Sequence, residues 1–227
     1  MTGRILENLR EVTDRIAAAA GRSGRAPAAV HLVAVTKTVD EDAVRALAAA
    51  GQKAVGENRA QQLRDRAVAL AGLGLEWHMI GRLQRKNVRH IVPAAAMIHS
   101  VDSVDLAEEI SKRADAAGIR ATCLLEINSG EAQKAGVLPA EAAAVASAIA
   151  ALPGIDLVGL MTMAPLADDP ETVRPVFAAL RELRDRINRA AALPHPLTEL
   201  SMGMTQDYEV AVEEGATIVR IGTALYR

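Results

Sequence analysis

One lysine stands where a predicted strand gives way to a predicted helix. Lys37 follows the valine-rich run 31–35, which is typical of a strand buried on both faces of a parallel sheet. Asp40 and Glu41 then open a helical pattern, and the spacing of Thr38 and Glu41 predicts a capping box. Ligands of α/β proteins bind where strands end in this way. Lys37 is therefore a candidate for amine chemistry, with an ordinary solvated loop lysine as the alternative.

Two turns late in the chain combine a small residue with a hydroxyl. Ser201 and Gly203 lie between a predicted strand and a predicted helix, and Gly222 and Thr223 follow the last predicted strand. Glycine permits close approach of the backbone to a ligand, and N–H groups at the start of a helix suit an anion. Two such turns on neighbouring strands can clamp one phosphate between them. The alternative is that glycine and serine are ordinary turn residues.

Arg220 interrupts the apolar strand predicted over 217–221. A guanidinium buried in a strand needs partners, which are either a ligand or a neighbouring acid. A lysine and a phosphate clamp at one sheet edge together indicate a carbonyl compound that carries phosphate. Pyridoxal 5′-phosphate (PLP) and sugar phosphates both qualify, each through a Schiff base with the lysine.

Three further polar groups are expected at the same edge. They are the segment 56–58, the loop 128–136 and His78, which we interpret as a hydrogen-bonded histidine of the protein interior. No His, Cys, Asp or Glu residues have the spacing of metal ligands, and the chain lacks the glycine-rich nucleotide-binding motifs.

The composition excludes several classes of function. The 227 residues carry a net charge of -2, from 26 basic and 28 acidic residues, and only 2% are aromatic. Neither the basic footprint nor the stacking platform of a nucleic-acid-binding protein is present. The single cysteine, Cys123, lies in the apolar run 121–127 and is expected to pack in the core. Charges interrupt residues 1–20, and no apolar run is long enough to span a bilayer, so we expect a cytoplasmic protein without membrane contact.

Strand and helix patterns alternate along the whole chain. After an amphipathic N-terminal helix, strands are predicted at 31–35, 53–56, 77–80, 97–101, 121–128, 157–163, 197–202 and 217–221. The helices between them include 40–50, 82–91 and a long one from 169 to 189. Such alternation implies a parallel sheet, and eight units fit a single (β/α)8 TIM-type barrel domain over residues 1–227. A doubly wound open sheet is the alternative.

Several of these segments are similar to those of one known family. The stretches are Leu-Val-Ala-Val-Thr-Lys-Thr at 32–38, Gly-Glu-Asn at 56–58, Trp-His-Met-Ile-Gly at 77–81, Ser-Met-Gly-Met at 201–204 and Val-Arg-Ile-Gly-Thr at 219–223. Together with the loop 128–136 and Gly-Leu-Met at 159–161, they resemble the pyridoxal phosphate homeostasis protein family. The resemblance implies a PLP-binding barrel related in fold to the N-terminal domain of alanine racemase.

The resemblance also implies roles for individual residues. Lys37 would hold PLP as a Schiff base, Arg220 would face the pyridine nitrogen, and the phosphate would lie against Ser201, Gly203, Gly222 and Thr223. Asn58 and Met202 complete the implied set of cofactor-binding residues. The family motif Gln-x-Asn-Lys reads Gln-Arg-Lys-Asn at 84–87 in this chain. Lys86 and Lys134 are therefore open candidates for a second, transient PLP contact.

The function implied is PLP (vitamin B6) homeostasis, without an established catalytic turnover. An arginine at the pyridine nitrogen cannot leave it protonated, so the ring is a weak electron sink. A PLP-dependent amino-acid racemase of low activity and a Schiff-base aldolase acting on a sugar phosphate are the alternatives. The implied partners are PLP and PLP-dependent apo-enzymes, and we expect a monomer.

Overall fold

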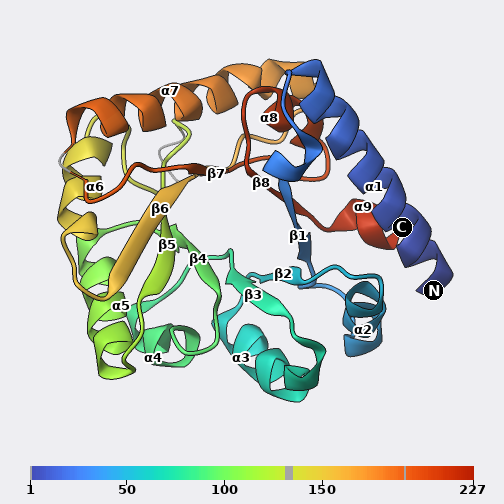
Figure 1. Cartoon of the computed structure of the whole chain (residues 1–227), viewed down its shortest axis with the longest axis horizontal. Helices are drawn as coiled ribbons and strands as arrows, with labels where there is room; N and C mark the ends of the chain where they lie inside the picture. The colour runs from blue at the N-terminus through green and yellow to red at the C-terminus, as the bar shows by residue number, and fades with distance from the viewer. Residues whose placement is uncertain (1, 131–134, 192) are drawn as a thin grey trace.

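The strands form a closed barrel. In the computed structural model, which describes residues 2–130, 135–191 and 193–227, eight parallel strands pair in chain order, and the last pairs with the first (Figure 1). The strands are β1 (His31–Val35), β2 (Ala54–Glu57), β3 (Glu76–Met79), β4 (Met97–Val101), β5 (Ala121–Glu126), β6 (Ile155–Met161), β7 (Glu199–Ser201) and β8 (Ile218–Ile221). The prediction of a barrel is confirmed, and the open sheet is ruled out by the pairing of His31 with Ile218.

Helices surround the barrel on its outside (Figure 1). They are α1 (Thr2–Arg22), α2 (Glu41–Ala49), α3 (Ala60–Ala69), α4 (Val88–Ile91), α5 (Val104–Ala116), α6 (Ala142–Ala150), α7 (Arg174–Ala190), α8 (Tyr208–Glu213) and α9 (Thr223–Tyr226). Short 3-10 turns are η1 (Pro27–Ala29), η2 (Ala71–Leu73), η3 (Arg85–Asn87) and η4 (Pro170–Val173). The predicted N-terminal helix is present.

The two ends of the chain pack against each other. Helix α1 lies along α8 and α9 (Figure 1), and the Asn8 side chain donates to the carbonyl of Arg227 at 2.8 Å. Arg15 and Arg22 form ion pairs with Glu209, and Arg22 forms another with Glu213. The extra N-terminal helix therefore packs against the two helices that follow β7 and β8.

The core is aliphatic, as the low aromatic content requires. A large cluster fills the space between the strands and the helices, and it includes Cys123, which is fully buried as predicted. A smaller cluster of Val33, Leu124, Met161 and Ile218 lies apart from it. Among the described residues, no helix combines the length and apolarity that a bilayer span requires.

Two local predictions are wrong. The N-cap of α2 is Asp40, whose Oδ1 accepts from the Ala43 N–H at 2.9 Å, so Thr38 and Glu41 do not form the predicted capping box. The helix predicted over 82–91 is reduced to η3 and the single turn of α4. Before these turns, Gly81 lies against the backbone of Asn58, and a Cβ there would be 2.3 Å from the Asn58 carbonyl oxygen. Pro93 limits the other end, because it has no N–H to continue the hydrogen bonds of the helix.

Candidate functional site

The predicted site residues gather at the carboxyl ends of the strands. Because β1 pairs with both β8 and β2, the turn that contains Lys37 lies between the β8 and β2 ends. A Cβ on Gly222 would lie 3.3 Å from the Cβ of Val35, so the turn after β8 is in contact with the end of β1. The structure thus brings the lysine and the second glycine turn together, as the sequence predicts.

The turn that carries Lys37 is fixed from helix α3. Arg66 donates from Nη1 to the Thr36 carbonyl at 2.7 Å and from Nη2 to the Val39 carbonyl. Gln62, one helical turn earlier, donates to the Lys37 carbonyl at 3.3 Å. The Lys37 side chain is exposed and makes no hydrogen bond or ion pair with the described residues. A turn held by three hydrogen bonds from α3 thus carries an amine that is unpaired among the described residues.

Glu57, at the end of β2, completes this support. Its Oε1 accepts from the Thr36 hydroxyl and from Arg66 Nη1, both at 2.6 Å. The Glu57 side chain is fully buried, and Arg66 is nearly so, with 11% of its side chain exposed. Neither residue was predicted to act on Lys37, since the pairing joins separate elements and leaves no periodic signal in the sequence.

Arg220 is buried, and no carboxylate of the described residues pairs with it. It is 4% exposed, and its Nη1 donates to Ser201 Oγ at 2.6 Å while Nη2 donates to the Thr162 carbonyl at 3.0 Å. Within the described residues it forms no ion pair, so the alternative of a structural salt bridge fails for that part of the chain. Burial lowers the pKa of Arg220 to about 10, against the opposing charges of Asp207 and Glu126.

Two histidines lie behind Ser201 in the barrel interior. His99 Nδ1 is 2.9 Å from Ser201 Oγ, and His99 Nε2 is 2.8 Å from His78 Nδ1. Burial lowers the pKa of His78 to about 4 and that of His99 well below its usual value. His78 is the hydrogen-bonded interior histidine that the sequence predicts. His99 was not predicted, and its place within an apolar strand was the only available signal.

The two glycine turns offer backbone donors. The N–H groups of Gly203, Thr205, Gln206, Gly222, Thr223 and Ala224 have no hydrogen-bond partner among the described residues. Gly203 has a φ of 94°, which favours glycine. The turns are joined directly, since the Arg220 N–H donates to the Gly203 carbonyl at 3.0 Å. This arrangement can receive a group rich in acceptor oxygens.

The other predicted site residues are Met202, Asn58, Lys86 and Lys134. Met202 is fully buried in the core, and its N–H already donates to the Ile218 carbonyl. Asn58 is half-buried at the mouth, with its backbone against Gly81. Lys86 is exposed on η3, and Lys134 lies outside the described residues.

One acidic group at the mouth was not singled out by the sequence. Glu126 ends β5 and is 4% exposed. Burial, with the nearby charge of Asp102, raises the pKa of Glu126 to about 7, while Arg220 and Arg82 act in the opposite direction. No set of described residues could hold a metal ion.

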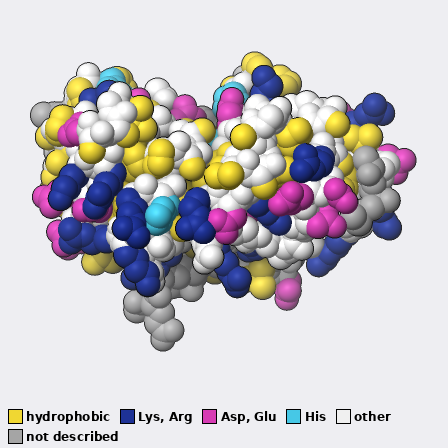
Figure 2. Space-filling view, turned by 90° about the horizontal axis from the view of Figure 1, so that it is seen from below, with side chains coloured by type: hydrophobic (Ala, Val, Ile, Leu, Met, Phe, Trp, Pro, Cys, Tyr) yellow, Lys and Arg dark blue, Asp and Glu magenta, His cyan; other side chains and the backbone are white. Residues whose placement is uncertain are grey.

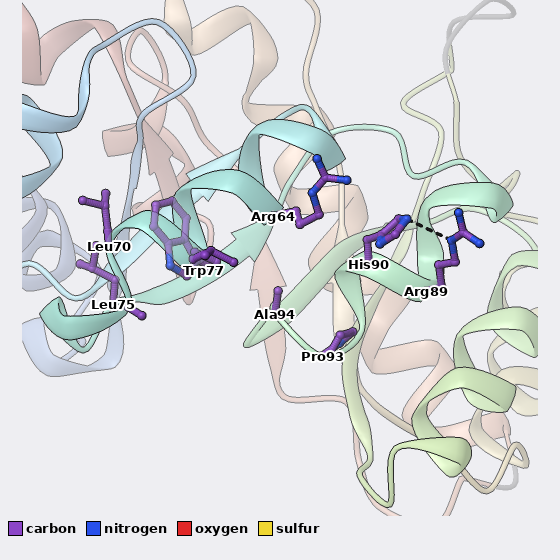
Figure 3. Close-up of a pocket in the computed structure, with 11 residues that line it drawn as sticks. Arg64, Leu70, Leu75, Trp77, Arg89, His90, Pro93 and Ala94 are labelled. Atoms are coloured by element: carbon purple, nitrogen blue, oxygen red, sulfur yellow. Dashed lines mark hydrogen bonds between the residues drawn. The ribbon is translucent and has the colours of Figure 1, made fainter.

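A groove on the outer shell is separate from these residues. It has a volume of about 520 Å³ and lies between α3 and α4 (Figure 3). Arg64, Arg89 and His90 line it opposite Leu70 and Leu75, and none of the predicted cofactor residues does. Lys and Arg side chains also gather toward one end of the face that is seen from below (Figure 2).

The closed parallel barrel places the chain in the class described as "Alanine racemase, N-terminal domain", whose family profile matches residues 6–227. A pyridoxal phosphate homeostasis protein of Aquifex aeolicus is 45% identical over 223 residues, which cover 97% of this chain and 96% of the relative. The chain belongs to the pyridoxal phosphate homeostasis protein family, as its motifs predicted.

Solved structures agree with this assignment. PipY of Synechococcus elongatus, whose structure has PLP bound, is 35% identical with a TM-score of 0.85, covering 98% of this chain and 100% of PipY. Alanine racemase of Clostridium difficile is 18% identical with a TM-score of 0.70, over 87% of this chain and 54% of the racemase. The second likeness is one of fold alone.

Proposed function

We propose that this chain binds PLP at the barrel mouth and serves PLP homeostasis without catalytic turnover. The observation that carries the proposal is the buried Arg220, which has no carboxylate partner among the described residues and whose Nε–H is likewise unused. A cation held only by neutral acceptors is suited to an electron-rich ligand atom. The PLP-bound relative supports the choice of ligand.

The donor set fits the three polar parts of PLP. The free backbone N–H groups of the two glycine turns suit the phosphate oxygens. Arg220 can only donate, and it therefore suits an unprotonated pyridine nitrogen. The exposed Lys37 supplies a primary amine, which adds to the aldehyde carbon, forms a C=N bond and releases one water.

Arg220 also explains why turnover is not expected. When bound, PLP supplies an electron-withdrawing ring, and that effect is strongest when the pyridine nitrogen is protonated. A guanidinium donor keeps this nitrogen unprotonated, since arginine does not accept a proton. The chain is thus arranged to hold PLP rather than to stabilise carbanions on it.

A PLP-dependent amino-acid racemase of low activity is the second candidate. Glu126 favours it, because a carboxyl at the mouth with a pKa raised to about 7 can transfer protons at neutral pH. Exchange of the α-deuterium of labelled amino acids tests it. A catalytic exchange rate that Glu126→Gln abolishes would support the racemase over the carrier.

Borohydride reduction with peptide mapping tests the anchor. We expect the reduced protein to carry one pyridoxyl group on the peptide that contains Lys37, and Lys37→Ala to lose both the label and the visible absorption. Lys53→Ala is the matched control, because Lys53 is an exposed lysine next to β2. A Lys37→Ala protein with an unchanged reducible chromophore contradicts the assignment. Label on Lys86 or Lys134 would identify a second PLP contact.

The proposal also covers the oligomeric state, location and partners of the protein. We infer that residues 1–227 act as a single domain and a monomer in the cytoplasm, and that the bound PLP passes to PLP-dependent apo-enzymes. Reactivation of an apo-enzyme by the loaded protein, compared with an equal amount of free PLP, tests the transfer. Sedimentation of the purified chain tests the monomer.

A further inference from the structure

Four buried polar side chains form a continuous line through the barrel interior. Arg220 of β8 contacts Ser201 of β7, which contacts His99 of β4, which contacts His78 of β3. All four are at most 7% exposed, and the three steps measure 2.6, 2.9 and 2.8 Å. Such a line is costly in a barrel core unless each polar atom is satisfied.

One arrangement of protons satisfies the buried hydroxyl and both histidines. Arginine has donors only, so Ser201 Oγ must accept from it. Among the described residues, His99 Nδ1 is the only acceptor within reach of the Ser201 hydroxyl proton, so this buried proton is satisfied only if His99 Nδ1 is unprotonated. His99 therefore carries its proton on Nε2 and donates to His78 Nδ1, which leaves His78 protonated on Nε2.

We propose that Ser201 and His99 are positioning residues for Arg220, and that Ser201 is not a phosphate ligand. This inference rests on the proposed function only for its consequence on PLP. The one hydroxyl proton of Ser201 is used by His99, and a phosphate dianion requires a donor. The phosphate therefore depends on the backbone of the glycine turns, and Ser201 acts on the cofactor through the guanidinium.

The neutral histidines are what make this arrangement stable. A protonated His99 would place a second cation near the buried Arg220, with only Ser201 between them. Arg220 and His99 would then both donate to Ser201, and the Ser201 proton would have no acceptor there. Burial and the charges of His78 and Arg220 lower the pKa of His99 and keep it neutral. Ser201 and the Thr162 carbonyl each accept from one terminal nitrogen, so the Nε–H is among the guanidinium donors that stay available for a ligand.

Nitrogen-15 NMR of the histidines in the PLP-free protein tests the direction of these hydrogen bonds, because it shows which ring nitrogen carries the proton. We expect His99 as the neutral tautomer with its proton on Nε2, and a change in its Nδ1 signal in Ser201→Cys, which keeps the size but weakens the hydrogen bond. His99 with its proton on Nδ1, or as an imidazolium at pH 7, would overturn the inference. This measurement needs no PLP, so it stands even where the proposed function fails.

A comparison of PLP with pyridoxal, which lacks the phosphate, tests the role of Ser201. If Ser201 acts through Arg220 on the ring, Ser201→Cys and His99→Phe should lower the affinities for PLP and pyridoxal by the same factor. That factor is on the order of 10-fold for one lost hydrogen bond to a charged group. If Ser201 binds the phosphate, Ser201→Cys should weaken PLP and leave pyridoxal unchanged, which overturns the inference.

Controls distinguish a loss of ligand affinity caused by misfolding from one caused by a displaced Arg220. Circular dichroism and thermal unfolding must show that each variant is folded. Thr198→Ala removes an exposed hydroxyl next to the start of β7 without touching Arg220 and should leave the affinity for both ligands unchanged. A wild-type protein that binds neither ligand refutes the proposed function, while the tautomer of His99 still decides the inference.

Discussion

Arg66 Nη1 lies 2.7 Å from the carbonyl oxygen of Thr36 and 2.6 Å from Glu57 Oε1. One guanidinium thus holds the backbone immediately before Lys37 and neutralises a fully buried carboxylate. The second nitrogen of the same group holds the Val39 carbonyl on the other side of the lysine. The backbone on both sides of Lys37 is therefore held by hydrogen bonds from a residue on a different βα unit.

Arg66→Met should destabilise the protein strongly. It removes the arginine that pairs with the buried Glu57, and breaking a buried ion pair costs about 3–5 kcal/mol of unfolding free energy. Urea unfolding of the PLP-free protein measures the loss. Arg64→Met is the control, because the pair of Arg64 with Asp65 is exposed and is worth less than about 1 kcal/mol. Equal effects of the two variants would show that the buried pair is not structural.

Glu126 should make the stability fall as the pH rises. Burial raises its pKa to about 7 in the folded protein, above the value of about 4.3 in an unfolded chain. The folded state then binds more protons between these pH values, and stability declines across this window by about 4 kcal/mol.

Glu126→Gln should remove this decline, because the amide imitates the neutral acid at every pH. The difference between the unfolding free energies of the two proteins, measured at pH 4, 6 and 8, should therefore grow as the pH rises. The variant should be the more stable protein at pH 8. The exposed Glu108→Gln serves as the control. Parallel curves for wild type and Glu126→Gln would refute the raised pKa.

Gly203→Ala should damage the first glycine turn. The φ of 94° disfavours any side chain, and a Cβ would lie 2.6 Å from that of Ala211. We expect a loss of about 2 kcal/mol or more in unfolding free energy and weaker PLP binding. Gly24→Ala has a similar φ of 70° with open space around it, so it reports the backbone cost alone. A Gly203→Ala loss no larger than that of Gly24→Ala would show that Ala211 moves away freely.

The sequence predicts more of the scaffold than of the contacts behind the site. The strand that leads to Lys37 is found to the residue, because a valine run closed by polar residues is a local signal. Arg220 stands out for the same reason, as a charge inside an apolar strand. The cap on α2 uses the expected chemistry at Asp40 rather than Thr38, two residues away.

The contacts behind the site depend on distant partners. His99 meets Ser201 across 102 positions of the sequence, and no local pattern encodes that meeting. The sequence therefore assigns Ser201 to the phosphate by its position in a turn. Only the structure shows that its hydroxyl is shared between Arg220 and a histidine.

Arg220→Met should leave the PLP-free protein nearly as stable as the wild type, in contrast with Arg66→Met. Both arginines are buried, but the acceptors that Arg220 contacts among the described residues are neutral, so its removal breaks no ion pair there. Burying a lone cation is unfavourable, and a methionine in its place recovers that cost while leaving two acceptors unsatisfied. We expect a net change within about 1 kcal/mol in urea unfolding together with a large loss of PLP affinity by absorbance titration. A loss of more than about 3 kcal/mol with PLP affinity retained would mean that Arg220 serves the fold rather than the ligand.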